Sequence, residues 1–401
     1  MQIGWVDFSE KERRIVHELI RAMQNPETRD ELGIGRIRDF FSELFFPGTS
    51  LIQTRARYFL FIPWIFQRLE NERTRTADID RKTRDRESQL IEALRAGGES
   101  TGIIGGSAGR ALQRMPSDIY WPAMAKWDIF RAGHDRYVSR GMYYGSLDDI
   151  YKRRKSEARD EADELVYGES LDTWHPSLPD APHDLMTTTG FALERAEAEF
   201  LKERIQQNCA GTLIEFLILN KIGGLESISY LWDLGTKLPT QLAEQVDCAE
   251  RFSLLMHGAA IFYNICVARL IEQGRDAEFH SDLEHWFQAY HQMVGSRGDW
   301  EPGELASMGL LINSRTRRFL SEWHETVSRL GEWHELISKD HPAARLIESR
   351  EVSLKGKRAR LISQEARDQW SGASGLSRLD YRWRVAKVIV SDIIKGLERN
   401  A

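Results

Sequence analysis

The sequence predicts a mainly α-helical protein made of two helical domains. Apolar side chains recur at the three- and four-residue spacing of an amphipathic helix along most of the 401 residues. Ser9 and Glu12 have the spacing of a capping box, in which both side chains satisfy free amides at a helix start. Residues 251–272 are apolar on most faces, as expected of a buried central helix. The short opening, residues 3–8, is either a strand or a packed arm.

The N-terminal domain is predicted to span residues 1–155 around an aromatic core. A first helix starts at Ser9, a second covers 34–45, and a third covers 55–69 with a bend at Pro63. Nine aromatic side chains lie close together in this region: Phe40, Phe41, Phe45, Phe46, Tyr58, Phe59, Phe61, Trp64 and Phe66. Apolar mass at this density has to be buried, so these side chains are expected to form the core.

Residues 86–130 are predicted to form short helices around a glycine-rich loop. The expected helices are 88–94, 108–113 and a segment opened by Pro116, and three short helices joined by tight turns resemble a helix-turn-helix module. The loop at Gly102–Gly109 matches neither common phosphate-binding glycine pattern. A flexible turn is therefore the favoured interpretation, and Arg110 directly after the loop is a candidate phosphate contact.

The charge of the chain changes sign in the middle of the sequence. Residues 131–155 carry seven basic and three acidic side chains, whereas residues 156–203 carry thirteen acidic and three basic ones. Three prolines fall within residues 175–184. This composition predicts an acidic linker at 156–190 that separates the two domains.

The C-terminal domain, residues 191–401, is predicted to be helical throughout. An amphipathic helix opens it, a nearly all-apolar segment follows, and a last amphipathic helix closes it. The expected helices are 192–207, 213–219, 251–272, 281–294, 315–330, 364–370 and 381–397.

Composition excludes some functional classes. The net charge of −6 gives no global attraction to nucleic acid or to an anionic membrane, so any polyanion binding has to come from local patches. Three widely spaced cysteines suit reduced thiols in a cytoplasmic protein. The longest apolar run, residues 58–66, is far shorter than the roughly 20 residues of a membrane span. A cytoplasmic protein without a membrane partner is expected.

No catalytic or cofactor-binding pattern stands out, so neither an enzyme nor a cofactor is expected. His280, His285 and His291 do not have the spacing that places metal ligands on one helical face. His257 and Asn264 lie within the very apolar segment 251–272, where each side chain needs a hydrogen-bond partner. The simpler interpretation is that both side chains form hydrogen bonds within the folded chain and have no role in function.

Basic residues beside aromatic or glycine residues are the candidate contacts to nucleic acid. The sharpest cluster is R-E-V-S-L-K-G-K-R-A-R-L at residues 350–361, where flexible lysines and forked arginines can both reach phosphate oxygens. The alternative is that these side chains pair with acids of the same chain. The candidates are Arg55, Arg57, Arg110, Arg136, Lys152, Arg153, Arg154, Lys355, Lys357, Arg358 and Arg360.

Several motifs together resemble an uncharacterised bacterial family. They are I-G-W-V-D-F-S at 3–9, the segment 30–65, P-S-D-I-Y-W at 116–121, H-G-A-A-I-F-Y-N at 257–264 and the basic segment 350–361, with L-D-Y-R-W-R-V-A-K-V-I-V-S-D-I-I-K-G-L at 379–397. The family that the chain resembles is one of the domains of unknown function. Its genes often lie in antiphage defence islands, beside genes for helicases and methyltransferases. The resemblance implies a context near DNA and supplies no catalytic residues that could be assigned to positions of this chain.

The expected function is a non-catalytic component of an antiphage defence system. Such a component binds DNA or bridges DNA-acting partners such as a helicase or a methyltransferase. Two alternatives stay open: a protein–protein scaffold without DNA affinity of its own, and a divergent metal-dependent nuclease.

Overall fold

The computed structural model describes residues 30–106, 112, 114–131, 139–160, 173–272, 274–338, 341–370 and 372–399, with side chains omitted for 153–160. Over these residues the chain is mainly α-helical, so the predicted fold class is confirmed. The described residues contain no strand, and their one isolated bridge pairs Phe130 with Trp174. The predicted first helix, from Ser9, lies outside the described residues.

The chain forms two compact units, each built from separate stretches of sequence. The described residues of unit 1 fall within 30–38 and 247–379, and those of unit 2 fall within 39–246 and 380–399. The division falls within α2 (Gly35–Phe45) and α9 (Thr240–Ile271). These units differ from the predicted domains 1–155 and 191–401. The described part of the predicted linker, residues 173–190, belongs to unit 2 and buries Trp174, Leu178 and Leu185.

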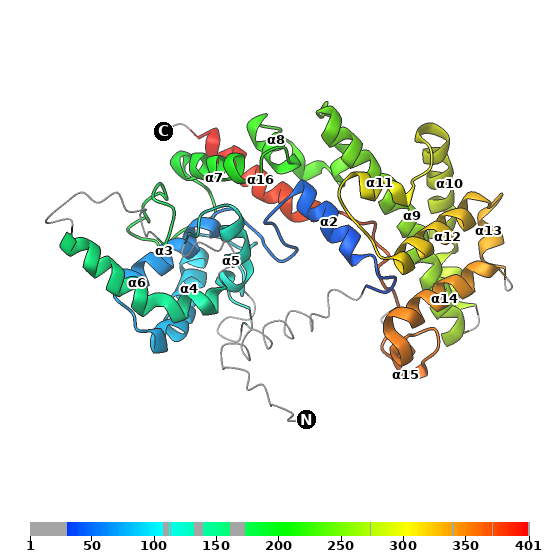
Figure 1. The fold of residues 1–401 in the computed structure, drawn as a ribbon, viewed down its shortest axis with the longest axis horizontal. Helices are drawn as coiled ribbons and strands as arrows, with labels where there is room; N and C mark the ends of the chain where they lie inside the picture. The colour runs from blue at the N-terminus through cyan, green and yellow to red at the C-terminus, as the bar shows by residue number, and fades with distance from the viewer. Residues whose placement is uncertain are drawn as a thin grey trace, which may run out of the picture. The chain divides into compact units, whose positions relative to one another are not determined.

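Figure 1 shows the helices of both units. Unit 2 contains α3 (Tyr58–Asn71), α4 (Thr76–Ala96), α5 (Pro116–Lys126), α6 (Arg140–Asp160), α7 (Arg195–Asn208), α8 (Leu213–Leu219), η3 (Leu225–Ser227), η4 (Leu231–Asp233) and α16 (Trp383–Leu397). Unit 1 contains η5 (Arg275–Phe279), α10 (His280–Arg297), α11 (Pro302–Ser307), α12 (Ser314–Ser328), α13 (Trp333–Leu336), α14 (Pro342–Lys355), η6 (Gly356–Arg358) and α15 (Gln364–Asp368).

The core of unit 2 is built around α3, which is buried on every side from Tyr58 to Phe66. This helix contacts α4 and α5, and α4 contacts α6. Phe59 stacks on Trp127 with ring centroids 4.1 Å apart. The predicted burial of the aromatic run is therefore confirmed, with only Phe40 of the nine aromatic side chains partly exposed.

The helix-turn-helix module proposed for residues 86–130 stays a prediction. Its expected middle helix, 108–113, lies almost entirely outside the described residues. The described start of the glycine loop forms turns in which Gly102 and Gly105 have positive φ angles of 80° and 82°. A side chain at Gly102 would clash with Arg55, because a Cβ atom there would lie 2.9 Å from the Arg55 Cγ atom.

The part of α9 within unit 1 is the central apolar helix that the sequence predicts. Trp286 and Trp323 donate from their indole nitrogens to the carbonyls of Leu254 and Leu255, at 2.8 and 3.0 Å. Gly258 is required at the contact with Trp286, because a Cβ atom there would lie 2.1 Å from the indole ring. Among the described helices, only α9 has the length and apolar composition to cross a membrane, and 72% of its most apolar window is buried inside the structure. The core helix of a folded domain meets the same criteria.

A buried carboxyl group links α4 to α5 in unit 2. Glu87 is 1% exposed and accepts hydrogen bonds from the Ser117 amide (2.6 Å) and hydroxyl (3.2 Å). Burial raises the pKa of Glu87 to about 7, although these bonds and the nearby Arg140 act in the opposite direction. The folded protein therefore binds this proton more tightly than the unfolded chain.

We expect Glu87 to make the protein less stable as the pH rises from about 4.5 to 7. Over this interval the unfolded chain releases the proton first, so the free energy of unfolding falls by roughly 3 kcal/mol and then stays constant. Glu87→Gln cannot ionise, so its free energy of unfolding should lack this decrease. Urea unfolding at pH 5, 6, 7 and 8 measures the difference. Asp85→Asn, a change at an exposed carboxylate of the same helix, is the control, and parallel profiles for Glu87→Gln and wild type would contradict the assignment.

Candidate nucleic-acid interface

Several of the sequence-predicted contacts cannot be placed. Arg110 and Arg136 lie outside the described residues, as do the side chains of Arg153 and Arg154. Lys152 is on the surface of α6, where it forms an ion pair with Asp149 at 3.3 Å.

Arg55 and Arg57 pair with carboxylates inside unit 2. Arg55 holds both carboxylate oxygens of Asp392 in α16, with its Nε and Nη2 atoms at 2.9 and 2.8 Å. Arg57 donates to Glu197 in α7 at 2.7 Å and to the carbonyl of Gly190 at 2.8 Å. Both side chains of the Arg57–Glu197 pair are less than a tenth exposed. These arginines thus connect the start of α3 to two other helices. This arrangement agrees with the alternative interpretation, in which the basic side chains pair with acids of the same chain.

The basic cluster at 350–361 divides into buried and exposed members. Arg360 is buried and donates to Glu31 at 2.7 Å, and Lys355 pairs with Glu31 and, at 3.2 Å, with Glu351. Tyr263 donates from its hydroxyl to Glu351 at 2.8 Å. Two carboxylates and two cations therefore balance each other in this cluster, which ties the chain at residue 31 to the end of α14.

Lys357 and Arg358 remain on the surface of unit 1. Both are exposed in η6, the short turn that directly follows α14. Among the described residues, no carboxylate lies within ion-pair distance of either side chain. Gly356 starts this turn with a φ angle of 54°, a conformation that glycine adopts without a steric penalty. The turn therefore presents two adjacent cations to solvent.

A second group of cations lies at the N-terminus of α12. Asn313 caps this helix by accepting a hydrogen bond from the Thr316 amide at 2.8 Å, and its first turn contains no acidic residue. Arg315 and Arg317 are exposed there. A helix N-terminus already carries a partial positive charge, so arginines at this position weaken the helix and strengthen attraction to anions.

A groove of about 370 Å³ lies between these α12 residues and the last turns of α14. Its lining includes Arg350, whose guanidinium is held by the carbonyls of Leu32 (2.8 Å) and Gly33 (3.1 Å) and by the Thr316 hydroxyl (3.1 Å). Burial lowers the pKa of Arg350 and Asp30 partly offsets this effect, yet an arginine stays protonated. Because no described carboxylate forms an ion pair with Arg350, the groove carries a positive charge.

We call this surface the basic edge and define it by Arg315, Arg317, Arg350, Lys357 and Arg358. α12 and α14 pack against each other (Figure 1). The short turn η6 also contacts α14. Leu354, which lines the groove, lies only three residues before Lys357. Lys357 and Arg358 are predicted from the sequence, whereas Arg315, Arg317 and Arg350 are not among the predicted contacts. The run N-S-R-T-R-R at 313–318, which has no acid and begins with the helix-capping residue Asn313, is the sequence signal that could identify Arg315 and Arg317.

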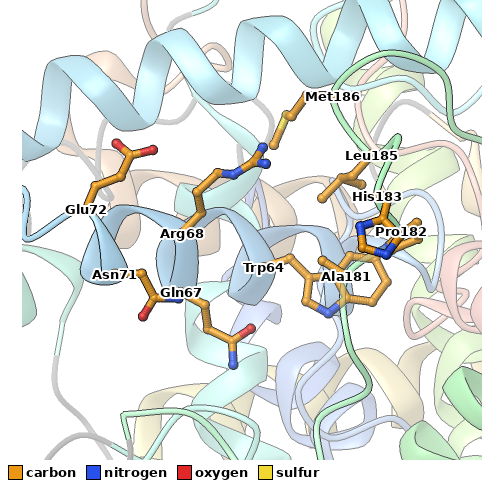
Figure 2. A pocket seen from close by; sticks show the side chains of 10 residues that line it. All are labelled: Trp64, Gln67, Arg68, Asn71, Glu72, Ala181, Pro182, His183, Leu185 and Met186. Atoms are coloured by element: carbon orange, nitrogen blue, oxygen red, sulfur yellow. The ribbon is translucent and has the colours of Figure 1, made fainter.

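Unit 2 has a groove of a different kind (Figure 2). It encloses about 490 Å³ between α3 and the proline-containing segment 181–186. Arg68 and Glu72 line it together with Trp64, whose indole donates to the Pro179 carbonyl at 2.6 Å. Glu72 pairs with Arg86 at 3.0 Å and with Lys82 at 3.5 Å. The groove thus mixes charges and lacks the concentration of cations found at the basic edge.

Within the described parts of the chain, no group of three or more His, Cys, Asp or Glu side chains is arranged to hold a metal ion. Fold and surface together define a mainly α-helical protein of two compact units, one of which bears an exposed cationic edge. The chain belongs to the DUF6361 family, a family of unknown function whose model matches residues 1–396. Searches of curated proteins and of solved structures found no match.

Proposed function

We propose that this protein contacts DNA through the basic edge, as a non-catalytic component of a bacterial antiphage defence system. The observation that carries the proposal is the contrast among the cations. Arg55, Arg57 and Arg360 are neutralised by carboxylates, whereas Lys357 and Arg358 face solvent without one among the described residues. The defence context rests on the motif resemblance, which places such genes beside helicases and methyltransferases.

The chemistry of the edge suits a phosphate backbone. Lysine and arginine side chains on exposed turns reach phosphate oxygens without reading the base sequence. The α12 N-terminus adds free amides and a positive partial charge. The net charge of the chain is −6, so attraction to a polyanion has to come from local patches such as this surface. Binding is then expected to be moderate in strength and steeply dependent on salt.

The proposal is tested by binding of the purified protein to short double-stranded and single-stranded DNA over a salt series. Fluorescence anisotropy should show binding at low salt that weakens steeply as salt rises. A protein that binds neither form at low salt does not contact DNA by itself, and that outcome would favour the scaffold alternative.

The scaffold alternative has a candidate surface in the groove of unit 2 (Figure 2). Its mixed polar lining and its rigid proline-containing wall suit a protein segment better than a polyanion. Pull-down of a neighbouring helicase or methyltransferase, with and without nuclease treatment, separates the two functions. Capture that survives nuclease treatment and is lost on Asn71→Trp, a change at the groove, would support the scaffold.

The third possibility is a divergent metal-dependent nuclease. Incubation of plasmid DNA with Mg²⁺ or Mn²⁺ tests it directly. Cleavage by the protein, alone or with its partner proteins, would replace the non-catalytic function proposed above.

A further inference from the structure

A small cavity that is partly open to solvent lies in unit 1, next to the segment that supports the basic edge. It has a volume of about 140 Å³. One wall is a face of α9 that includes Met256, His257 and Ala260, and the other walls come from residues 30–38 and 374–379. Neither DNA contact through the basic edge nor protein binding at the groove of unit 2 involves this cavity.

The size and lining of the cavity suit a single polar ring. A cavity of about 150 Å³ holds one benzene molecule. Met256 and Ala260 offer apolar surface on α9, and Leu32 and Leu379 offer it on the opposing segments. Polar residues at the same cavity include His257 and Ser377, and the charged residues Asp30, Glu31 and Arg38 also line it. An apolar pocket with a few polar groups is typical of sites that orient a small ring by hydrogen bonds.

His257 is suited to recognise such a ring as a neutral group. Burial, followed by the nearby charge of Arg378, lowers the pKa of His257, while a hydrogen bond to the backbone of Leu376 partly opposes the shift. The imidazole is therefore neutral at neutral pH. When one ring nitrogen of a neutral imidazole donates, the other is an acceptor.

The cavity and the basic edge share one supporting segment. Leu32 lines the cavity, and its carbonyl accepts a hydrogen bond from Arg350 at 2.8 Å. Glu31 also lines the cavity and pairs with Lys355, two residues before Lys357. The cavity and the basic edge thus both adjoin residues 31–33. In a nucleic acid strand, one nucleotide carries both a planar polar ring and a phosphate.

We propose that the cavity takes one unstacked, pyrimidine-sized base of single-stranded DNA whose phosphates lie along the basic edge. The inference rests on the proposed DNA contact and adds the form of DNA that is preferred. A base inside a duplex is stacked and paired and cannot enter, so recognition requires a single strand or an extruded base. The phosphate contacts position the strand, and the cavity selects strands that have a free base.

The test compares two oligonucleotides that carry the same number of phosphates. One is a 12-residue oligothymidylate, and the other has abasic sites in place of its central nucleotides. Wild type should bind the oligothymidylate about tenfold more tightly, as expected for the capture of one base. Ala260→Phe places a benzene-sized ring in the cavity and should bind both oligonucleotides with the affinity that wild type has for the abasic one.

Two further variants make the result decisive. Ala243→Phe adds the same ring at an exposed position of α9 and should keep the wild-type preference. If Ala260→Phe lowers the melting temperature, Ser377→Trp replaces it, because Ser377 is exposed at the cavity and tolerates a larger side chain. The proposal of a base pocket is overturned if wild type binds the two oligonucleotides equally. It is also overturned if Ala260→Phe or Ser377→Trp keeps the wild-type preference. In both cases the proposed phosphate contact still stands. Binding of neither oligonucleotide by wild type refutes the DNA contact itself.

Discussion

Reversing both exposed charges of η6, by Lys357→Glu together with Arg358→Glu, should weaken DNA binding about a hundredfold at low salt. Two charge-assisted contacts to phosphate, each worth about 1.5 kcal/mol, account for a loss of this size. The melting temperature should not fall, because both side chains are exposed and surface substitutions without a partner change stability by about 0.5 kcal/mol or less. Fluorescence anisotropy and thermal unfolding measure the two effects separately.

The control for this experiment reverses two other exposed lysines, Lys221→Glu with Lys237→Glu. It changes the net charge by the same amount at a surface that lies in unit 2. If general electrostatic attraction caused the binding, both double variants would weaken it equally. An equal loss, or an unchanged affinity in the η6 variant, contradicts the assignment of the contact to the basic edge.

Replacing Arg57 with methionine should destabilise unit 2 by about 3–5 kcal/mol, because the change leaves the Glu197 carboxylate buried without its cation. It also removes the bond from Arg57 to the Gly190 carbonyl. Replacing both partners, with Arg57→Met and Glu197→Leu, should recover part of the loss, since no charge is then buried. Urea unfolding measures the free energy of each variant.

Arg75→Met is the matched control for Arg57. Arg75 is also paired with a carboxylate, Asp78 at 2.7 Å, but its side chain is 81% exposed. An exposed pair contributes about 0–1 kcal/mol, so this variant should resemble wild type. Equal effects of the two methionine variants would show that the Arg57 pair is not structural. If the Arg57→Met protein is folded but binds DNA more weakly than wild type, Arg57 contacts DNA after all.

The fold class could be predicted because helical periodicity is a local property of the sequence. The predicted helix at 213–219 coincides with α8, and those at 34–45 and 192–207 nearly coincide with α2 and α7. The predicted helix at 88–94 was too short, because the buried face of the first half of α4 continues from Ile79 to the polar Thr83 and Glu87 and forms no apolar stripe. Its exposed face carries charged pairs such as Arg81–Asp85, at 3.6 Å. Charged pairs of this kind leave no hydrophobic period in the sequence.

The site was less predictable because the sequence shows where charges cluster and not which acids fold back onto them. Arg55 meets Asp392 across 337 positions of sequence, and Arg360 meets Glu31 across 329. Such long-range pairs decide which cations remain exposed. Lys355, Lys357, Arg358 and Arg360 lie within six residues, yet only the two in the middle face solvent without a partner among the described residues. The division into two units is a long-range property for the same reason, since each unit combines distant stretches of sequence.

The most direct test of the basic edge is the slope of log Kobs against log salt concentration for binding to duplex DNA. Each phosphate contact contributes about 0.9 to this slope. Removing the charges of Lys357 and Arg358 by substitution with glutamine should therefore reduce the slope by about two relative to wild type. A steep wild-type slope that stays the same in the glutamine variant would place the DNA contact elsewhere on the protein and contradict the central claim.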